Sequence, residues 1–226
     1  MTTEAQPCEV EIGDDADHFV AEAAQAVLDQ IALAIRERGR AVIAVSGGST
    51  PGPVYDRLSN SEADWAKVTV TLVDERLVDP ASPDSNERLV RERLLRGPAA
   101  AARFVPLATD QLAALPLPFD LVLLGMGGDG HTASLFPGNP ALAEGLTSAA
   151  LCIEVPAGQG GQAPPQARRS LTLAGINAAR RRILLIRGQD KIAVYRAALL
   201  SGDANLYPVA GVLNAPDNLN LLLCLV

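Results

Sequence analysis

FDLVLLGMGGDGHTASLFPG, residues 119–138, is the stretch that decides the fold. Its first part, Phe119 to Leu124, is an apolar run that predicts a buried strand. A glycine-rich turn follows, and glycines let backbone N–H groups approach a ligand closely. His131, one of two histidines in the chain, comes directly after that turn. A packing role for His131 is the alternative, but histidine serves as a general acid or base near neutral pH, so we predict a catalytic loop.

Strands and helices alternate along the rest of the chain. The pattern predicts helices over 16–38, 53–58, 85–95 and 190–200, with Gly39 as a C-cap and Ser85 or Asn86 as an N-cap. It predicts strands or extended segments over 40–45, 68–73, 104–107, 119–124, 152–155, 170–173, 182–186 and 219–226. No repeat or linker divides the chain. We therefore predict a single domain over residues 1–226, an α/β fold with a three-layer, mostly parallel Rossmann-like sheet and helices on both faces.

Composition narrows the class of protein. The chain has 226 residues, 48% of them apolar and 20% charged, as is ordinary for a soluble globular protein. Its 19 basic and 26 acidic residues give a net charge of −7, which argues against a nucleic-acid binder. No apolar run approaches the roughly 20 residues that span a bilayer, and the start lacks a signal-peptide pattern. Three scattered cysteines, Cys8, Cys152 and Cys224, fit a reducing, cytoplasmic location.

Three predicted strand ends carry unusual chemistry. They are the segments 46–50, 74–76 and 125–131. Ligands of open parallel sheets bind outside the carboxyl ends of the strands, so these segments converge on one crevice if their strands are neighbours.

The segment Ser46–Pro51 reads SGGSTP between a strand and a helix. Its glycines, its hydroxyls and the helix N-terminus form a phosphate cradle without the lysine of a P-loop. The alternative is a turn with a Ser or Thr helix cap. The 125–130 segment contains G-x-G-x-x-G, which is a weak signal when it stands alone.

Charged residues supply the remaining candidates. Asp74, Glu75 and Arg76 could orient a histidine and bind a phosphate or a polarised carbonyl, although a solvated loop is the alternative. Arg168 and Lys191 could bind phosphate, and solvated side chains are again the alternative. The sequence has no G-x-S-x-G, HExxH or CxxC motif, and two distant histidines exclude a His-rich zinc site.

Several motifs, in a fixed order, carry a resemblance to a known family. They lie at Val45–Pro51, Val73–Arg76, Pro83–Asn86, Gly125–Gly138, Arg168–Thr172 with Asn177, and Gly188–Lys191. In combination they resemble the 6-phosphogluconolactonase family, which is related to glucosamine-6-phosphate deaminases. Those deaminases carry an aromatic residue at the position of Arg76, and their His loop continues differently from residues 132–136, so both features favour the lactonase. Residues 208–226 lack the Arg-Pro pair and the tryptophan often found near the family's end.

The resemblance implies hydrolysis of 6-phospho-D-glucono-1,5-lactone in the oxidative pentose phosphate pathway, without a metal or organic cofactor. His131 would be the general base on water, Asp74 or Glu75 would orient it, and Arg76 would stabilise developing charge or hold phosphate. The residues expected to bind substrate are Gly47, Gly48, Ser49, Thr50, Glu75, Gly128, Asp129, Gly130, Arg168 and Lys191.

Two other functions are weighed against this one. A glucosamine-6-phosphate deaminase or isomerase on the same fold would release ammonia. A non-catalytic phosphosugar sensor would carry a DNA-binding module, for which the sequence shows no segment. The expected partner is the small phosphosugar lactone, with no nucleic acid and no membrane, for a monomer or small homo-oligomer.

Overall fold

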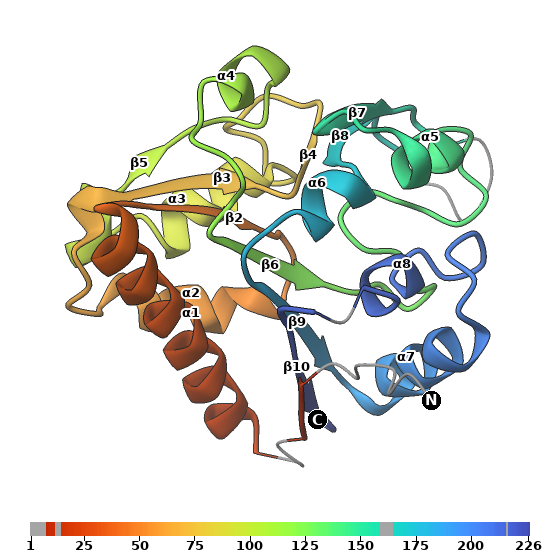
Figure 1. Ribbon diagram of the computed structural model, residues 1–226, viewed down its shortest axis with the longest axis horizontal. Coiled ribbons are helices and arrows are strands. Elements are labelled where there is room, and N and C mark those ends of the chain that lie inside the picture. The colour runs from red at the N-terminus through yellow and green to blue at the C-terminus, as the bar shows by residue number, and fades with distance from the viewer. Residues whose placement is uncertain (1–7, 12–14, 159–164, 216) are drawn as a thin grey trace.

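The computed structural model describes residues 8–11, 15–158, 165–215 and 217–226 (Figure 1). Its main sheet is parallel throughout, with strand order β1-β10-β9-β6-β2-β3-β5. The strands are β1 (Cys8–Glu11), β2 (Ala41–Val45), β3 (Val68–Leu72), β5 (Arg103–Phe104), β6 (Leu121–Gly125), β9 (Arg182–Arg187) and β10 (Leu219–Cys224). The predicted α/β class and parallel sheet are confirmed, and β1 is a strand that the sequence pattern did not reveal.

A second, smaller sheet corrects part of the prediction. It is antiparallel, with the order β4-β8-β7, and its strands are β4 (Asp74–Arg76), β7 (Cys152–Val155) and β8 (Arg168–Leu171). The strand at 152–155 and the extended segment near 170 were expected beside the parallel strands. Instead β8 pairs with β4, where Asp74 lies opposite Ser170, and β7 pairs with the other edge of β8.

Helices cover both faces of the main sheet, as predicted. They are α1 (Ala16–Arg38), α2 (Pro51–Ser59), α3 (Asn86–Arg93), α4 (Thr109–Ala113), α5 (Leu142–Thr147), α6 (Leu173–Asn177), α7 (Gln189–Ser201) and α8 (Ala210–Leu213), with short 3₁₀ helices at Trp65–Lys67 and Gly97–Ala101. The predicted C-cap is present, since Gly39 ends α1 with a φ of 73°. Of the two N-cap candidates of α3 it is Ser85 that caps the helix, because its hydroxyl accepts from the Arg88 N–H.

The order of the strands places the ligand crevice. From β2 the chain moves through α2 to β3 on one side, and from β9 it moves through α7 to β10 on the other. Right-handed crossovers in opposite directions put α2 and α7 on opposite faces, as Figure 1 shows. The direction of winding therefore reverses between neighbouring strands β2 and β6, and a crevice at their carboxyl ends is the usual ligand site of such a sheet.

The strands of this sheet read as continuous apolar runs because both faces are covered. All residues of β2 are buried, as are Leu121 to Leu124 of β6. Within the described residues, no helix has both the length and the apolar character needed to cross a bilayer.

Arg182, the first residue of β9, is a buried charge with 1% of its surface exposed. Its guanidinium donates to Asn177 Oδ1 (2.6 Å) and to the backbone carbonyls of Val212 (3.2 Å), Asp217 (2.5 Å) and Ala215. Burial lowers the pKa of Arg182, and the charge of Asp217 opposes that shift. One side chain thus ties α6 and the segment after α8 to the sheet.

Replacing Arg182 with alanine is expected to lower the free energy of unfolding by about 3 kcal/mol, because several buried carbonyls lose their donor together. Urea unfolding followed by circular dichroism measures the change. Arg181→Ala is the matched control: this neighbouring arginine is only partly buried and donates to Asn220 Oδ1 at 3.0 Å. Equal losses in the two variants would show that the buried network contributes little.

Candidate active site

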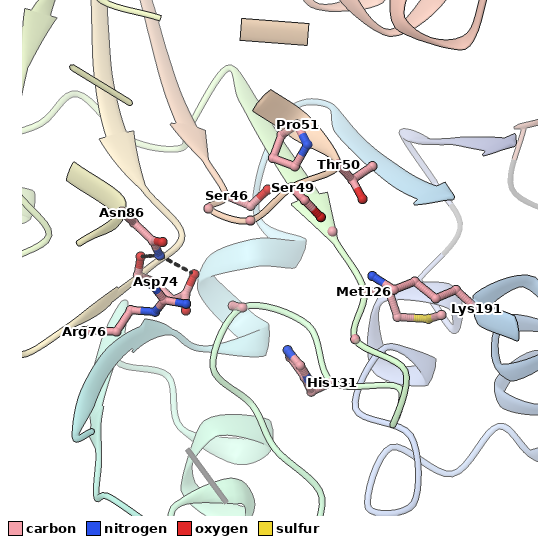
Figure 2. A pocket seen from close by; sticks show the side chains of 15 residues that line it. Ser46, Ser49, Thr50, Pro51, Asp74, Arg76, Asn86, Met126, His131 and Lys191 are labelled. Carbon is pink, nitrogen blue, oxygen red and sulfur yellow. Dashed lines mark hydrogen bonds between the residues drawn. The ribbon is translucent and has the colours of Figure 1, made fainter. Parts of the chain in front are cut away.

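A cavity of about 220 Å³ lies at the carboxyl ends of β2 and β6 (Figure 2). Eight of the residues predicted from the sequence line it: Gly47, Gly48, Ser49, Thr50, Asp74, Arg76, His131 and Lys191. The structure thereby brings together the three strand ends, which are separated in the sequence. Figure 2 shows Lys191 and Arg76 on opposite sides of the cavity, with His131 reaching toward the space between them.

The 46–50 loop presents free hydroxyls to this cavity. Thr50 stands at the N-cap of α2, yet its side chain makes no capping hydrogen bond, so the capping alternative does not account for it. The Ser46 hydroxyl is buried and has no hydrogen-bond partner among the described residues. The buried Tyr55 side chain anchors this loop, because its hydroxyl donates to the Ser46 carbonyl at 2.5 Å. Burial raises the pKa of Tyr55, which therefore stays a donor.

His131 is paired with Asp129. The imidazole Nδ1 lies 2.5 Å from Asp129 Oδ1, and the His131 backbone N–H donates to the same oxygen at 3.1 Å. An ionised carboxylate only accepts hydrogen bonds, so Nδ1 carries the proton and Nε2 keeps its lone pair. The geometry therefore makes Nε2 the basic nitrogen of the site.

The charge of Asp129 supports this assignment. Burial acts to raise the pKa of Asp129, but the hydrogen bonds and charge of His131 outweigh it, and the net effect is a lowered pKa. The carboxylate thus remains ionised at neutral pH and holds the tautomer described above.

Asp74 has a different role from the one expected. It is buried, and its Oδ2 accepts from the Ser134 hydroxyl at 2.5 Å. Its other oxygen and its carbonyl accept from the Asn86 amide at 3.4 and 2.9 Å. The expected partner of His131, Asp74 or Glu75, is therefore replaced by Asp129, which lies two residues away on the same turn.

Glu75 and Arg76 are neighbours in the sequence, but only Arg76 lines the cavity. Glu75 turns away from the cavity and caps α3, where it accepts from the backbone N–H groups of Asn86 (2.8 Å) and Glu87 (2.7 Å) and from the Ser85 hydroxyl (3.0 Å). Arg76 lines the cavity and donates from Nη1 to the Asp84 carbonyl. Its buried Nε has no partner among the described residues, so this arginine has a donor to spare.

The remaining predicted residues are not among those that line the cavity. Gly128 and Gly130 form the turn that carries Asp129, and Gly130, with a φ of 80°, packs against Tyr207. Arg168 is held by Asp74, 3.5 Å away. Sequence reasoning expected all of these to bind substrate, and the structure gives them no place among the cavity-lining residues.

Several residues at the cavity were not foreseen as site residues. Asn86, Met126, Gly127 and Ala133 all line it. Asn86 belongs to one of the motifs quoted for the resemblance, and that motif was its only signal. Ala133 takes a left-handed φ of 48°, which sequence patterns do not announce for alanine.

Known proteins are similar to this chain over most of its length. The model of the glucosamine-6-phosphate isomerase and 6-phosphogluconolactonase family matches residues 14–222. The chain belongs to this family. A 6-phosphogluconolactonase of Pseudomonas aeruginosa is 40% identical over 205 residues, 84% of each chain. One of Mesorhizobium japonicum is 45% identical over 202 residues, 84% of this chain and 83% of the relative. The resemblance inferred from the motifs is confirmed.

Solved structures of this family extend the likeness to the whole fold. The crystal structure of a 6-phosphogluconolactonase from Shewanella baltica superposes with a TM-score of 0.92 at 34% identity and covers 99% of both chains. One described as a putative 6-phosphogluconolactonase from Neisseria gonorrhoeae gives a TM-score of 0.85 at 35% identity, over 96% of this chain and 98% of that one.

Proposed function

We propose that this chain hydrolyses 6-phospho-D-glucono-1,5-lactone to 6-phosphogluconate, a reaction of the oxidative pentose phosphate pathway. The observation that carries the proposal is one cavity that combines a histidine paired with a carboxylate, an arginine with a spare donor and a separate cationic end. Lactone hydrolysis needs these three functions: a base for water, a group that stabilises the oxyanion, and a grip on the phosphate. The named relatives support the same choice of substrate.

The chemical steps follow from the geometry of His131. Its Nε2 accepts a proton from water while the new hydroxide oxygen bonds to the lactone carbonyl carbon. Charge moves to the carbonyl oxygen, where the Arg76 guanidinium stabilises it. The tetrahedral intermediate collapses as the bond to the ring oxygen breaks, and the imidazolium returns its proton to that oxygen. Asp129 stabilises the imidazolium between the two transfers.

The phosphate is assigned to the opposite end of the cavity. Ser49, Thr50 and the N-terminus of α2 lie there, and Lys191 in the first turn of α7 supplies the positive charge. The sequence left open whether Arg76 holds the phosphate or stabilises charge on the lactone carbonyl. With the phosphate at the other end of the cavity, we assign Arg76 to the carbonyl. A local cation is needed because the chain as a whole carries a net charge of −7.

No step in this scheme needs a metal or an organic cofactor, and we propose that the reaction runs without either. We also propose that the enzyme is a single domain that works in the cytoplasm, as a monomer or small homo-oligomer, with no partner other than its substrate. The buried free thiol of Cys224 supports a reducing compartment.

The test is hydrolysis of freshly generated lactone, coupled to 6-phosphogluconate dehydrogenase, with and without EDTA. We expect turnover well above the spontaneous rate and no effect of the chelator. Turnover no faster than the background would refute the proposal, and ammonia release from glucosamine 6-phosphate would then support the deaminase side of the family. Loss of activity in EDTA would refute the metal-free mechanism alone.

Gly127→Ala is expected to lower kcat by at least about tenfold, because a Cβ at this position would meet the His131 ring at 2.1 Å. The ring would have to turn away from its productive orientation, and such misplacement costs rate. Gly128→Ala is the matched control, since its Cβ would meet nothing within 4 Å and its φ is not in the left-handed region. Equal effects of the two substitutions in the coupled assay would contradict the expected contact.

A further inference from the structure

The His131 ring has a second contact that the proposed mechanism does not use. It packs on Phe136, with ring centroids 4.4 Å apart and planes tilted by 42°. Phe136 is buried in a small apolar cluster apart from the main core, together with Leu135, Leu142 and Ile153. Asp129 fixes one nitrogen of the imidazole, and Phe136 and the close Gly127 backbone confine the plane of the ring.

Phe136 is in turn covered by a buried cation. The Arg168 guanidinium carbon lies 5.1 Å from the centroid of the Phe136 ring. The Arg168 side chain is only 13% exposed. A cation over an aromatic face is attracted by the ring, and the attraction grows as both groups lose water. The guanidinium is therefore placed to hold the ring that holds His131.

Polar contacts fix Arg168 from the side of β4. Its Nη1 lies 3.5 Å from Asp74 Oδ2 and donates to the Ser134 hydroxyl at 3.4 Å. Ser134 itself donates to Asp74 and, through its backbone N–H, to Ser170 Oγ at 3.0 Å. The small antiparallel sheet thus anchors the His131 loop, because Asp74 of β4 and Ser170 of β8 both bond to Ser134.

We propose that Arg168 is a positioning residue for His131 and acts through Phe136, rather than a ligand of the substrate phosphate. This inference rests on the proposed function for its kinetic consequences. It explains why an arginine with no place in the cavity lining is held by Asp74 beside the catalytic loop. It also gives Asp74 a purpose that does not involve proton transfer.

The kinetic test compares Arg168→Met, Phe136→Leu and the double variant. Each single variant is expected to lose about tenfold in kcat with KM within about twofold, and the double variant should lose little more than either one. A tenfold rise in KM with kcat retained would identify Arg168 as a phosphate ligand and overturn the proposal. Multiplying losses, about a hundredfold in the double variant, would show that Arg168 does not act through Phe136.

Arg169→Met is the matched control. This neighbour on β8 pairs with the exposed Glu154 at 2.8 Å and donates to the Leu107 carbonyl at 3.1 Å, away from the His131 loop. Its kcat and KM should equal those of the wild type. If Arg168→Met does not fold, Arg168→Lys keeps the cation with a single donor group, and a smaller loss in kcat at unchanged KM is expected. A raised KM in that variant would again overturn the proposal.

A measurement without substrate separates this proposal from the function. The chain has only two histidines, so ¹⁵N-histidine labelling gives two imidazole spin systems, and His18→Gln assigns them. In Arg168→Met the His131 signals should shift and broaden while those of His18 stay unchanged. Unchanged His131 signals would refute the positioning role even if lactone is hydrolysed. A wild type without lactonase activity would refute the function and leave this readout intact.

Discussion

Replacing His131 with alanine is expected to lower kcat for lactone hydrolysis about 10³-fold, with KM changed by less than about twofold. A general base contributes about 10²–10⁴-fold, and here the same group also returns a proton to the leaving oxygen. KM should stay nearly constant because the phosphate site that we propose lies at the Lys191 end of the cavity and does not involve the imidazole. The measurement is steady-state turnover in the coupled assay, corrected for spontaneous hydrolysis.

His18→Ala is the matched control for this substitution. It removes the other histidine, an exposed residue in the first turn of α1, and should leave both constants unchanged. A His131→Ala enzyme that keeps kcat within tenfold of the wild type would remove His131 from the chemistry. Arg76 and the spare Ser46 hydroxyl would then be the groups to examine as activators of water.

Local signals explain why much of the fold could be predicted. The helix over 16–38 was found with the same bounds, because its apolar spacing and the glycine at its end are both encoded within one segment. The buried strands were found because strands covered on both faces are apolar without interruption. The three strand ends were expected to meet, and the order β6-β2-β3 brings them together.

Pairing between distant segments explains what could not be predicted. Strands β4, β7 and β8 are short and polar in places, and nothing in their sequences shows that they leave the main sheet. The sequence also gives no sign of the contact that Arg168 makes. This residue is predicted to bind phosphate, and in the structure its Nη1 lies 3.5 Å from Asp74 Oδ2, a pairing between distant segments.

The partner of His131 could not be predicted because turn geometry decides it. Asp129 reaches Nδ1 only because the turn at 127–130 folds back, where the Gly130 N–H donates to the Gly127 carbonyl at 3.1 Å. Asp74 looked equally suitable, since it ends a strand beside the same crevice. The distances give the two carboxylates different roles. Asp129 contacts the imidazole, and Asp74 anchors the His131 loop through Ser134.

Asp129→Asn should therefore lower kcat strongly, although it changes the shape of the side chain very little. The asparagine amide can donate to Nδ1, which would move the imidazole proton to Nε2 and remove the lone pair that accepts from water. We expect kcat to fall about 10²-fold, with KM nearly constant. Asp203→Asn is the matched control, because Asp203 accepts from the Asn205 N–H at 2.8 Å in the same i to i+2 contact but faces no imidazole.

The pH dependence tests the same assignment. Because the hydrogen bonds and charge of His131 outweigh burial and lower the pKa of Asp129, its carboxylate stays ionised around neutral pH, and the wild-type kcat should show no step from this group there. The asparagine variant should remain impaired across the same range, since its defect is a misplaced proton on the imidazole. A wild-type kcat in the asparagine variant at any pH in this range would show that His131 selects its tautomer without this carboxylate.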